Sequence, residues 1–121
     1  MADTVRTPDF KSFYANNVRF ESTVFDLRLF FGELDHREDE SWIISQKASV
    51  VMAWSQAKIA ALFLLVNVMA HEQQNGPVDL PANLLPPWLL PEDSELSLEE
   101  LVGTVADKFN SFVAQQQEQQ K

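Results

Sequence analysis

The stretch SQAKIAALFLLVNVMAHEQQNGP, residues 55–77, decides the fold of this chain. Ser55 is a suitable N-cap, and Gly76 followed at once by Pro77 is typical of a helix C-terminus. The stretch therefore predicts a long helix over residues 56–75. Its apolar run, 59–70, is interrupted by Asn67 and falls short of the roughly 20 residues that a membrane span needs, so we expect a core helix.

The apolar residues of this helix surround it rather than forming one stripe. Ile59, Leu62, Phe63, Val66 and Met69 share one side, and Leu64, Leu65 and Val68 extend the apolar surface around the cylinder. A helix that is apolar nearly all round is usually buried on two sides. We therefore expect something besides one sheet to cover it, either the C-terminal part of the chain or a second subunit.

Alternating apolar and polar residues predict strands before the helix. The alternation covers residues 14–20, 25–31 (ending at Gly32) and 44–54, with a tight turn at 22–24 and a solvated hairpin loop at 33–41. These strands predict an antiparallel meander. Residues 11–14 or 78–84 are candidates for a fourth strand.

Two further segments follow the helix. Residues 77–96, called the strap below, combine prolines with leucines and Trp88, so we expect an extended apolar segment that either covers the open side of the core or binds a partner. Ser97 and Glu100 have capping-box spacing, and Leu96 and Leu101 have the spacing of a hydrophobic staple. They predict an amphipathic helix over 97–121, frayed from 115 onward. Its apolar stripe comprises Leu98, Leu101, Val102, Val105, Phe109, Phe112 and Val113.

Composition limits the possible functions. The 121 residues fit one domain, which we divide into a core (1–76), the strap (77–96) and a C-terminal helix of the same domain (97–121). The net charge of −9 opposes binding to nucleic acid and to anionic membranes. The chain has no Cys, which excludes disulfides and thiolate metal sites, and the first ten residues lack an apolar signal region. We expect a cytoplasmic protein.

The sequence shows no arrangement of catalytic residues. The only histidines, His36 and His71, have no nucleophile motif around them, and His71-Glu72 lacks the second His of a zincin. The three glycines stand alone, so no phosphate-binding loop is visible. The acidic loop around His36 does not follow the ligand plan of a calcium loop. We predict no enzyme activity, no cofactor and no metal site.

Several spaced motifs carry a family resemblance. YANNV (14–18), FDLRLFF (25–31), MAWSQAK (52–58) and the Leu-rich helix that follows are similar to the bacterial domain-of-unknown-function family numbered 3467. The resemblance implies a bacterial source and brings no activity with it. In overall plan the acidic chain also resembles the SecB-type export chaperones, which have a four-stranded sheet, assemble as dimers of dimers and bind unfolded preproteins.

Together these features predict an α+β fold: an antiparallel three- or four-stranded meander packed on one long helix, then the strap and a C-terminal amphipathic helix, as in SecB-like proteins. The leading hypothesis is a non-enzymatic protein-interaction domain that forms a homodimer or higher homo-oligomer. The alternative is a SecB-like holdase for unfolded or nascent polypeptides. The candidate protein-binding residues are Leu64, Leu65, Val68, Leu85, Trp88, Leu89, Val105, Phe109 and Phe112.

Overall fold

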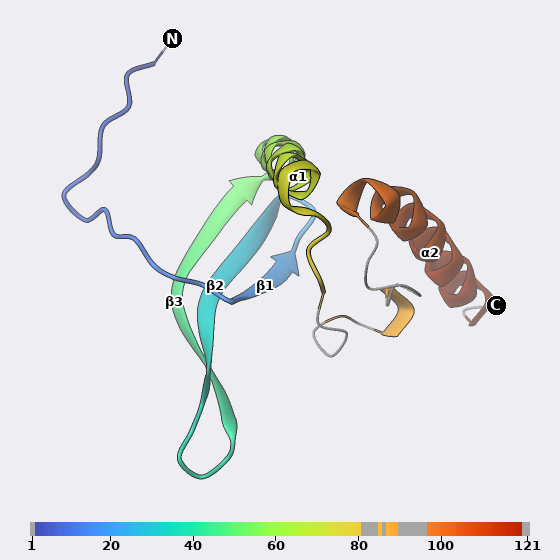
Figure 1. The fold of residues 1–121 in the computed structure, drawn as a ribbon, viewed down its shortest axis with the longest axis horizontal. Helices are drawn as coiled ribbons and strands as arrows, with labels where there is room; N and C mark the ends of the chain where they lie inside the picture. Colours follow the sequence, from blue (N-terminus) through green and yellow to red (C-terminus); the bar gives the residue numbers. More distant parts are fainter. Residues whose placement is uncertain (1, 81–84, 86, 90–96, 120–121) are drawn as a thin grey trace. The chain divides into compact units, whose positions relative to one another are not determined.

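The computed structural model describes residues 2–80, 85, 87–89 and 97–119. Its elements follow the order β1, β2, β3, α1, η2, α2 (Figure 1). The chain divides into two compact units, residues 1–58 and 59–121, and each is described by itself. The α+β class, with three antiparallel strands in one sheet before a long helix and a C-terminal helix, is confirmed.

The sheet is a three-stranded meander in the order β1-β2-β3. Its strands are β1 (Asn17–Ser22), β2 (Asp26–His36) and β3 (Trp42–Ala53). Both pairings are antiparallel, and the β2–β3 ribbon continues beyond Asn17, the first residue of β1 (Figure 1). At the β1–β2 turn the Thr23 N–H donates to the Asp26 carbonyl oxygen over 2.9 Å, which closes the tight hairpin.

The register places the predicted apolar residues on one face. Leu29 lies opposite Phe20 of β1 and Val50 of β3, and side chains directly opposite each other in an antiparallel pair share a face. The same face therefore holds further apolar residues of the alternating stretches. They are Val18, Leu27, Phe31, Ala48 and Met52.

The strand boundaries differ from the prediction. β1 begins at Asn17 rather than at residue 14, and β2 continues through Gly32 to His36, so the hairpin loop shrinks from 33–41 to 37–41. Backbone hydrogen bonds do not depend on side-chain polarity, so the ladder carries polar residues such as Asp35, which faces Ile43 of β3. No described residue in 11–14 or 78–80 forms a fourth strand, and 81–84 lie outside the described residues.

Gly32 is the site of a bulge rather than the end of a strand. Phe31 faces Ala48 but Gly32 faces Gln46, so Lys47 is the extra residue of β3. A Cβ atom on Gly32 would lie 2.8 Å from the backbone oxygen of Ser45, which leaves room for hydrogen alone. The Lys47 ammonium reaches the Glu33 carboxylate, with 2.6 Å between Nζ and Oε2. Glycine therefore makes the close approach of β2 and β3 possible at this point.

Helix α1 (Trp54–Asn75) begins directly after β3, with no loop between them. Ser55 therefore lies inside the helix and is not its N-cap, contrary to the prediction. Instead, the Trp54 indole N–H donates to the Thr23 carbonyl oxygen over 3.0 Å and ties the start of the helix to the β1–β2 turn. The predicted C-terminus is confirmed: Gly76 has φ of 86° and its N–H donates to the Glu72 carbonyl oxygen over 2.8 Å.

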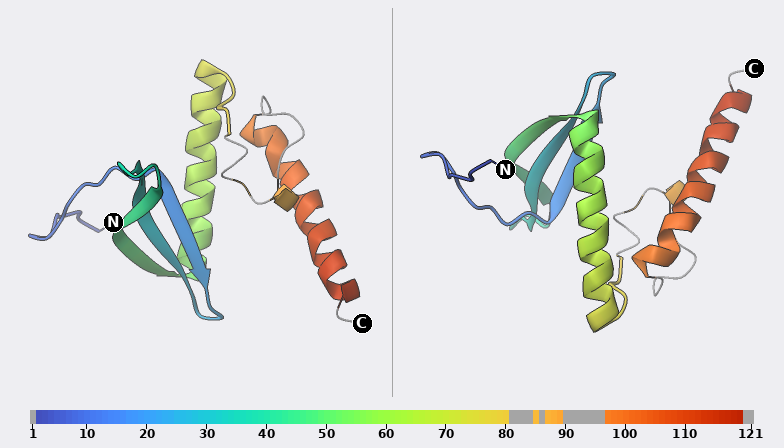
Figure 2. Two further views of the ribbon diagram at one scale, coloured as in Figure 1. Left: turned by 90° about the horizontal axis from the view of Figure 1, so that it is seen from below. Right: turned by 90° about the horizontal axis from the view of Figure 1, so that it is seen from above.

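The second unit continues with a short 3-10 helix in the strap, η2 (Pro87–Leu89), and with α2 (Leu98–Gln119). Both long helices are uninterrupted (Figure 2). The Ser97 hydroxyl accepts from the Glu100 N–H over 3.2 Å and donates to the Glu100 carboxylate over 3.1 Å, so Ser97 is the predicted N-cap. Leu96 of the predicted staple lies outside the described residues. Helix α2 extends to Gln119, and the fraying expected from residue 115 stays a prediction.

Candidate protein-binding surfaces

The surface of α1 is apolar on several sides. Leu64 is 66% exposed and Val68 is 36% exposed, while Leu65 between them is half-buried. Asn67, the polar residue within this run, satisfies its side chain locally because its Nδ2 donates to the Phe63 carbonyl oxygen over 2.7 Å. One hydrogen-bond donor of Asn67 is therefore satisfied within the helix.

None of the apolar side chains in the described ranges is buried. On the apolar face of the sheet Phe20 is 64% exposed, and the central residues Leu29 and Phe31 are half-buried. A protein of this length normally holds a core of fully buried Leu, Ile, Val and Phe side chains. Neither unit, taken by itself, forms such a core from its described residues.

Within the second unit, described residues of the strap and of α2 line an apolar groove. It has a volume of about 290 Å³, and the described residues that line it are all Leu or Val. We call it the leucine groove. Its walls are Leu80, Leu85 and Leu89 from the strap and Leu98, Leu101, Val102 and Val105 from α2.

Beside the groove, aromatic rings join η2 to α2. Trp88 stacks on Phe112 with 4.8 Å between ring centroids and 19° between ring planes, and Phe109 lies 6.3 Å from the same indole. Offset or tilted ring pairs at such distances add about 0.5–1.5 kcal/mol to simple burial. The rings therefore hold η2 against the middle of α2.

Glu72, near the end of α1, is the best-buried polar residue among those described, with 9% of its surface exposed. Its Oε1 accepts from the Leu98 N–H over 2.6 Å, and its Oε2 accepts from the Val78 N–H over 2.9 Å. The Leu98 and Val78 donors hold the pKa of this carboxyl below its ordinary value, and nearby His71 adds to the effect. One carboxylate thus joins the end of α1, the start of the strap and the start of α2.

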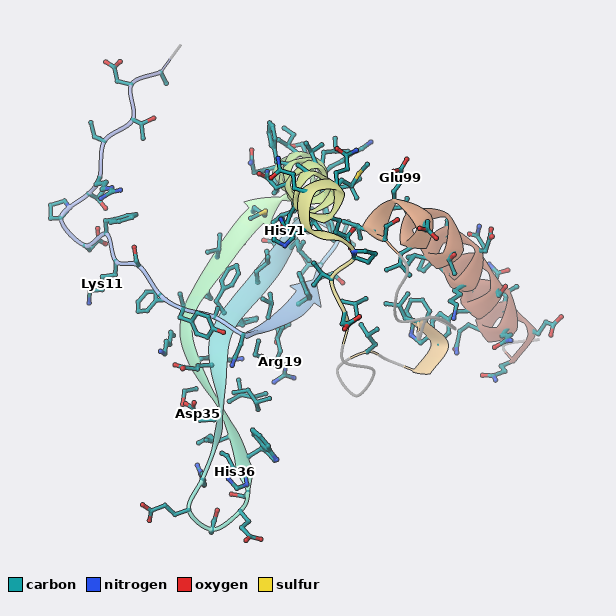
Figure 3. All side chains as sticks on the ribbon, viewed as in Figure 1. Lys11, Arg19, Asp35, His36, His71 and Glu99 are labelled. Atoms are coloured by element: carbon teal, nitrogen blue, oxygen red, sulfur yellow. The ribbon has the colours of Figure 1, made fainter. Side chains whose placement is uncertain are left out.

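The histidines occupy separate elements, His36 at the end of β2 and His71 on α1 (Figure 3). The His36 ring packs edge-on against Trp42 with 4.8 Å between centroids. Asn75 donates to the His71 carbonyl oxygen over 3.0 Å, and its Nδ2 also lies 3.4 Å from His71 Nδ1. In the described part of the chain, no three His, Asp or Glu side chains gather as metal ligands would.

The structure brings together most of the candidate residues from the sequence. Leu85, Leu89 and Val105 line the leucine groove, while Trp88, Phe109 and Phe112 form the ring cluster. Leu64, Leu65 and Val68 lie on α1.

Sequence reasoning missed Glu72 and the groove residues Leu80, Leu98, Leu101 and Val102 as members of a site. The apolar stripe of the last helix already contained Leu98, Leu101 and Val102, but no local pattern could show that Leu80 lies opposite them. Glu72 carried no signal, since its partner Leu98 is 26 residues away.

Residues 2–80 of the chain match a known protein family, whereas two further comparisons found no match. The model of the family described as protein of unknown function (DUF3467) matches residues 2–80. No curated protein and no solved structure matches the chain. No helix in the described ranges is both long and apolar enough to cross a membrane.

Proposed function

We propose that this chain, which belongs to the DUF3467 family of proteins of unknown function, is a non-enzymatic protein-interaction domain that assembles with further copies of itself through α1. The observation that carries the proposal is the lack of any buried apolar side chain in the described part of a single chain. Burying one Leu, Val or Phe side chain contributes about 1.5–3 kcal/mol, so a chain with so many exposed ones gains stability by covering them.

The surface of α1 supports self-association more than any other described surface. Leu62, Phe63 and Leu64 are successive residues of one helical turn, and each is more than half exposed. Successive residues point to different sides of a helix, so α1 presents apolar side chains on several sides. A second copy presents the same side chains, so each helix would cover part of the other.

Charge also favours this surface for contact between copies. Residues 54–75 contain one base and one acid, Lys58 and Glu72, so α1 is formally neutral. Residues 76–121 contain eight acids and two lysines, a net charge of −6. Two copies can therefore approach along α1 without the repulsion that their C-terminal segments would produce.

Static light scattering at micromolar concentration tests the proposal. We expect a wild-type mass of at least twice 13.8 kDa. Leu64→Glu places a charge in the proposed contact and should reduce the subunit count, whereas Gln74→Glu adds the same charge to the exposed end of the same helix and should leave it unchanged. A wild-type monomer that binds no hydrophobic dye would refute self-assembly.

A second candidate function is that of a SecB-like holdase, and the leucine groove with the adjacent ring cluster supports it. Both expose apolar surface from the strap, where an extended unfolded chain could bind. A holdase should suppress the aggregation of a model unfolded protein, and the double variant Trp88→Ala with Leu89→Ala should lose this effect. No suppression at several-fold excess would exclude it. For either function we propose a cytoplasmic location, which the absence of Cys supports.

A further inference from the structure

Strand β3 lies at one edge of the sheet and has a neighbouring strand on one side alone. The strand order is β1-β2-β3, and no strand among the described residues pairs with the outer side of β3 (Figure 1). β3 is also the longest strand described, with 12 residues against 6 in β1. An open edge presents a row of unpaired backbone N–H and C=O groups, which a further strand can bind. The edge therefore fits an extended backbone.

The register shows which backbone groups of β3 point outward. The Asp26 carbonyl oxygen accepts from the Thr23 N–H over 2.9 Å at the β1–β2 turn, so Asp26 directs its backbone groups toward β1. Directions alternate along a strand, so Leu29 directs its groups toward β3, where it lies opposite Val50. Val50 therefore directs its groups toward β2, and the residues before and after it direct theirs away from the sheet.

Residues 48–53 lack the features that keep edge strands unpaired. Natural edge strands are protected by charged side chains, proline or a bulge. Lys47 is the only charged residue of β3, and its ammonium is held by Glu33 of the neighbouring strand. The bulge at Lys47 interrupts the edge, but residues 48–53 beyond it contain no charge and no proline. β1, at the other edge, is shorter and carries Arg19 and Glu21.

A second copy of the chain fits this edge. Residues directly opposite each other in an antiparallel pair have the same backbone direction, so a two-fold axis can pass through Val50 or through Val51. These two registers give the largest overlap of residues 48–53 with themselves, and no like charges lie opposite each other. In both registers Val50 lies opposite an apolar residue of the same face, either Val50 or Met52 of the second copy. The apolar face of one sheet thus continues into the other.

We infer that two copies of this chain join edge to edge through residues 48–53 of β3. They form one antiparallel sheet of six strands, three from each copy. The inference rests on the proposed self-association and adds to α1 a second contact between copies. Backbone hydrogen bonds supply this contact, and the wider apolar face gives the helices of the assembly a larger surface to cover.

Cysteine cross-linking tests this inference on the full chain, which has no Cys of its own. The variants are Val50→Cys, Val51→Cys and, as a control, Ser45→Cys, all at exposed positions of β3. A disulfide needs Cα atoms within about 7 Å of each other. With the axis at Val50 or Val51, one of the first two variants meets this limit. The two copies of residue 45 would lie roughly 34 Å or more apart, at about 3.4 Å per residue.

Under mild oxidation, Val50→Cys or Val51→Cys should form a covalent dimer at least about tenfold faster than Ser45→Cys. Each replaces an exposed side chain, so all three variants should fold. Equal rates in the three variants, or the fastest rate in Ser45→Cys, would overturn the inference.

Amide hydrogen exchange tests the edge without any substitution. The Val51 amide points outward from β3, and the Phe20 amide points outward from β1, since Phe20 lies opposite Leu29 on the side away from β2. After correction for intrinsic rates, the Val51 amide should exchange at least about tenfold more slowly than the Phe20 amide. Equal protection of the two amides would contradict pairing through β3.

Light scattering on the same proteins separates the two contacts between copies. An oligomeric wild type without preferential cross-linking at Val50 or Val51 would refute the edge pairing and leave the contact through α1. Preferential cross-linking in a chain whose subunit count Leu64→Glu does not change would refute the contact through α1 and support the edge pairing. A monomeric wild type would refute both, and the edge would then be free for a strand of another protein.

Discussion

Replacing Gly32 by alanine should destabilise the sheet through lack of space. The added Cβ would lie 2.8 Å from the Ser45 backbone oxygen, 3.2 Å from Ile44 Cγ2 and 3.3 Å from Gln46 Cα. Two of these atoms are backbone of the paired strand, so relief requires β2 and β3 to move apart at the bulge. Overpacking costs about 1–3 kcal/mol, and the lower chain entropy of alanine in the unfolded state returns roughly 0.4–1 kcal/mol. We expect a net loss of about 1–2 kcal/mol.

The assay is thermal unfolding followed by far-UV circular dichroism at one fixed protein concentration, because the melting temperature of an assembly depends on concentration. A loss of this size corresponds to a decrease in melting temperature of roughly 4–8 °C in a chain of about this length. Gly103 is the control because it lies inside α2 and no atom lies within 4 Å of a Cβ added there. Gly103→Ala should therefore gain about 0.5–1 kcal/mol from helix propensity.

A Gly32→Ala variant that melts at or above the wild-type temperature, while Gly103→Ala melts higher as expected, would refute the proposed close approach at the bulge. Gly76→Ala provides a third comparison. It has open space around it but a φ of 86°, so it should lose about 1–2 kcal/mol through backbone strain rather than through a clash.

Three further predictions concern the second unit. The pKa of Glu72 is lowered from its ordinary value of 4.5, so its charged carboxylate stabilises the folded chain. The wild type should therefore melt at a higher temperature than Glu72→Gln above about pH 5, and this difference should disappear as the pH falls through the lowered pKa. A difference that stays constant down to about pH 3 would contradict the role of the charged carboxylate. A double-mutant cycle of Trp88→Ala and Phe112→Ala in urea unfolding should give a coupling of about 0.5–1.5 kcal/mol, and additive single effects would show that the stacked rings do not interact energetically. Ser97→Ala should lower the stability of α2 by about 1 kcal/mol in the same assay and Ser97→Asp should not, whereas equal losses for both would argue against N-capping.

Local patterns predicted most of the secondary structure. Alternation in 25–31 located β2 because adjacent side chains of a strand point to opposite faces. Gly76-Pro77 located the end of α1, and Ser97 with Glu100 located the start of α2, because both are interactions within one helical turn. The errors lie where local polarity was taken as a boundary: the polar residues 33–36 extend β2, and Ser55 lies within α1.

The sequence by itself determined the class of fold, the order of its elements and the unusual apolar surface of α1, since all of these depend on residues at most four positions apart. Only the tertiary structure showed that Gly32 permits a bulge, that Glu72 joins the strap to α2, and that Leu80 faces the first turns of α2 across a groove. These features depend on contacts between residues far apart in the chain, such as the 26 residues from Glu72 to Leu98. The backbone path that brings them together is set by packing and hydrogen bonding over the whole unit, and no local spacing encodes it.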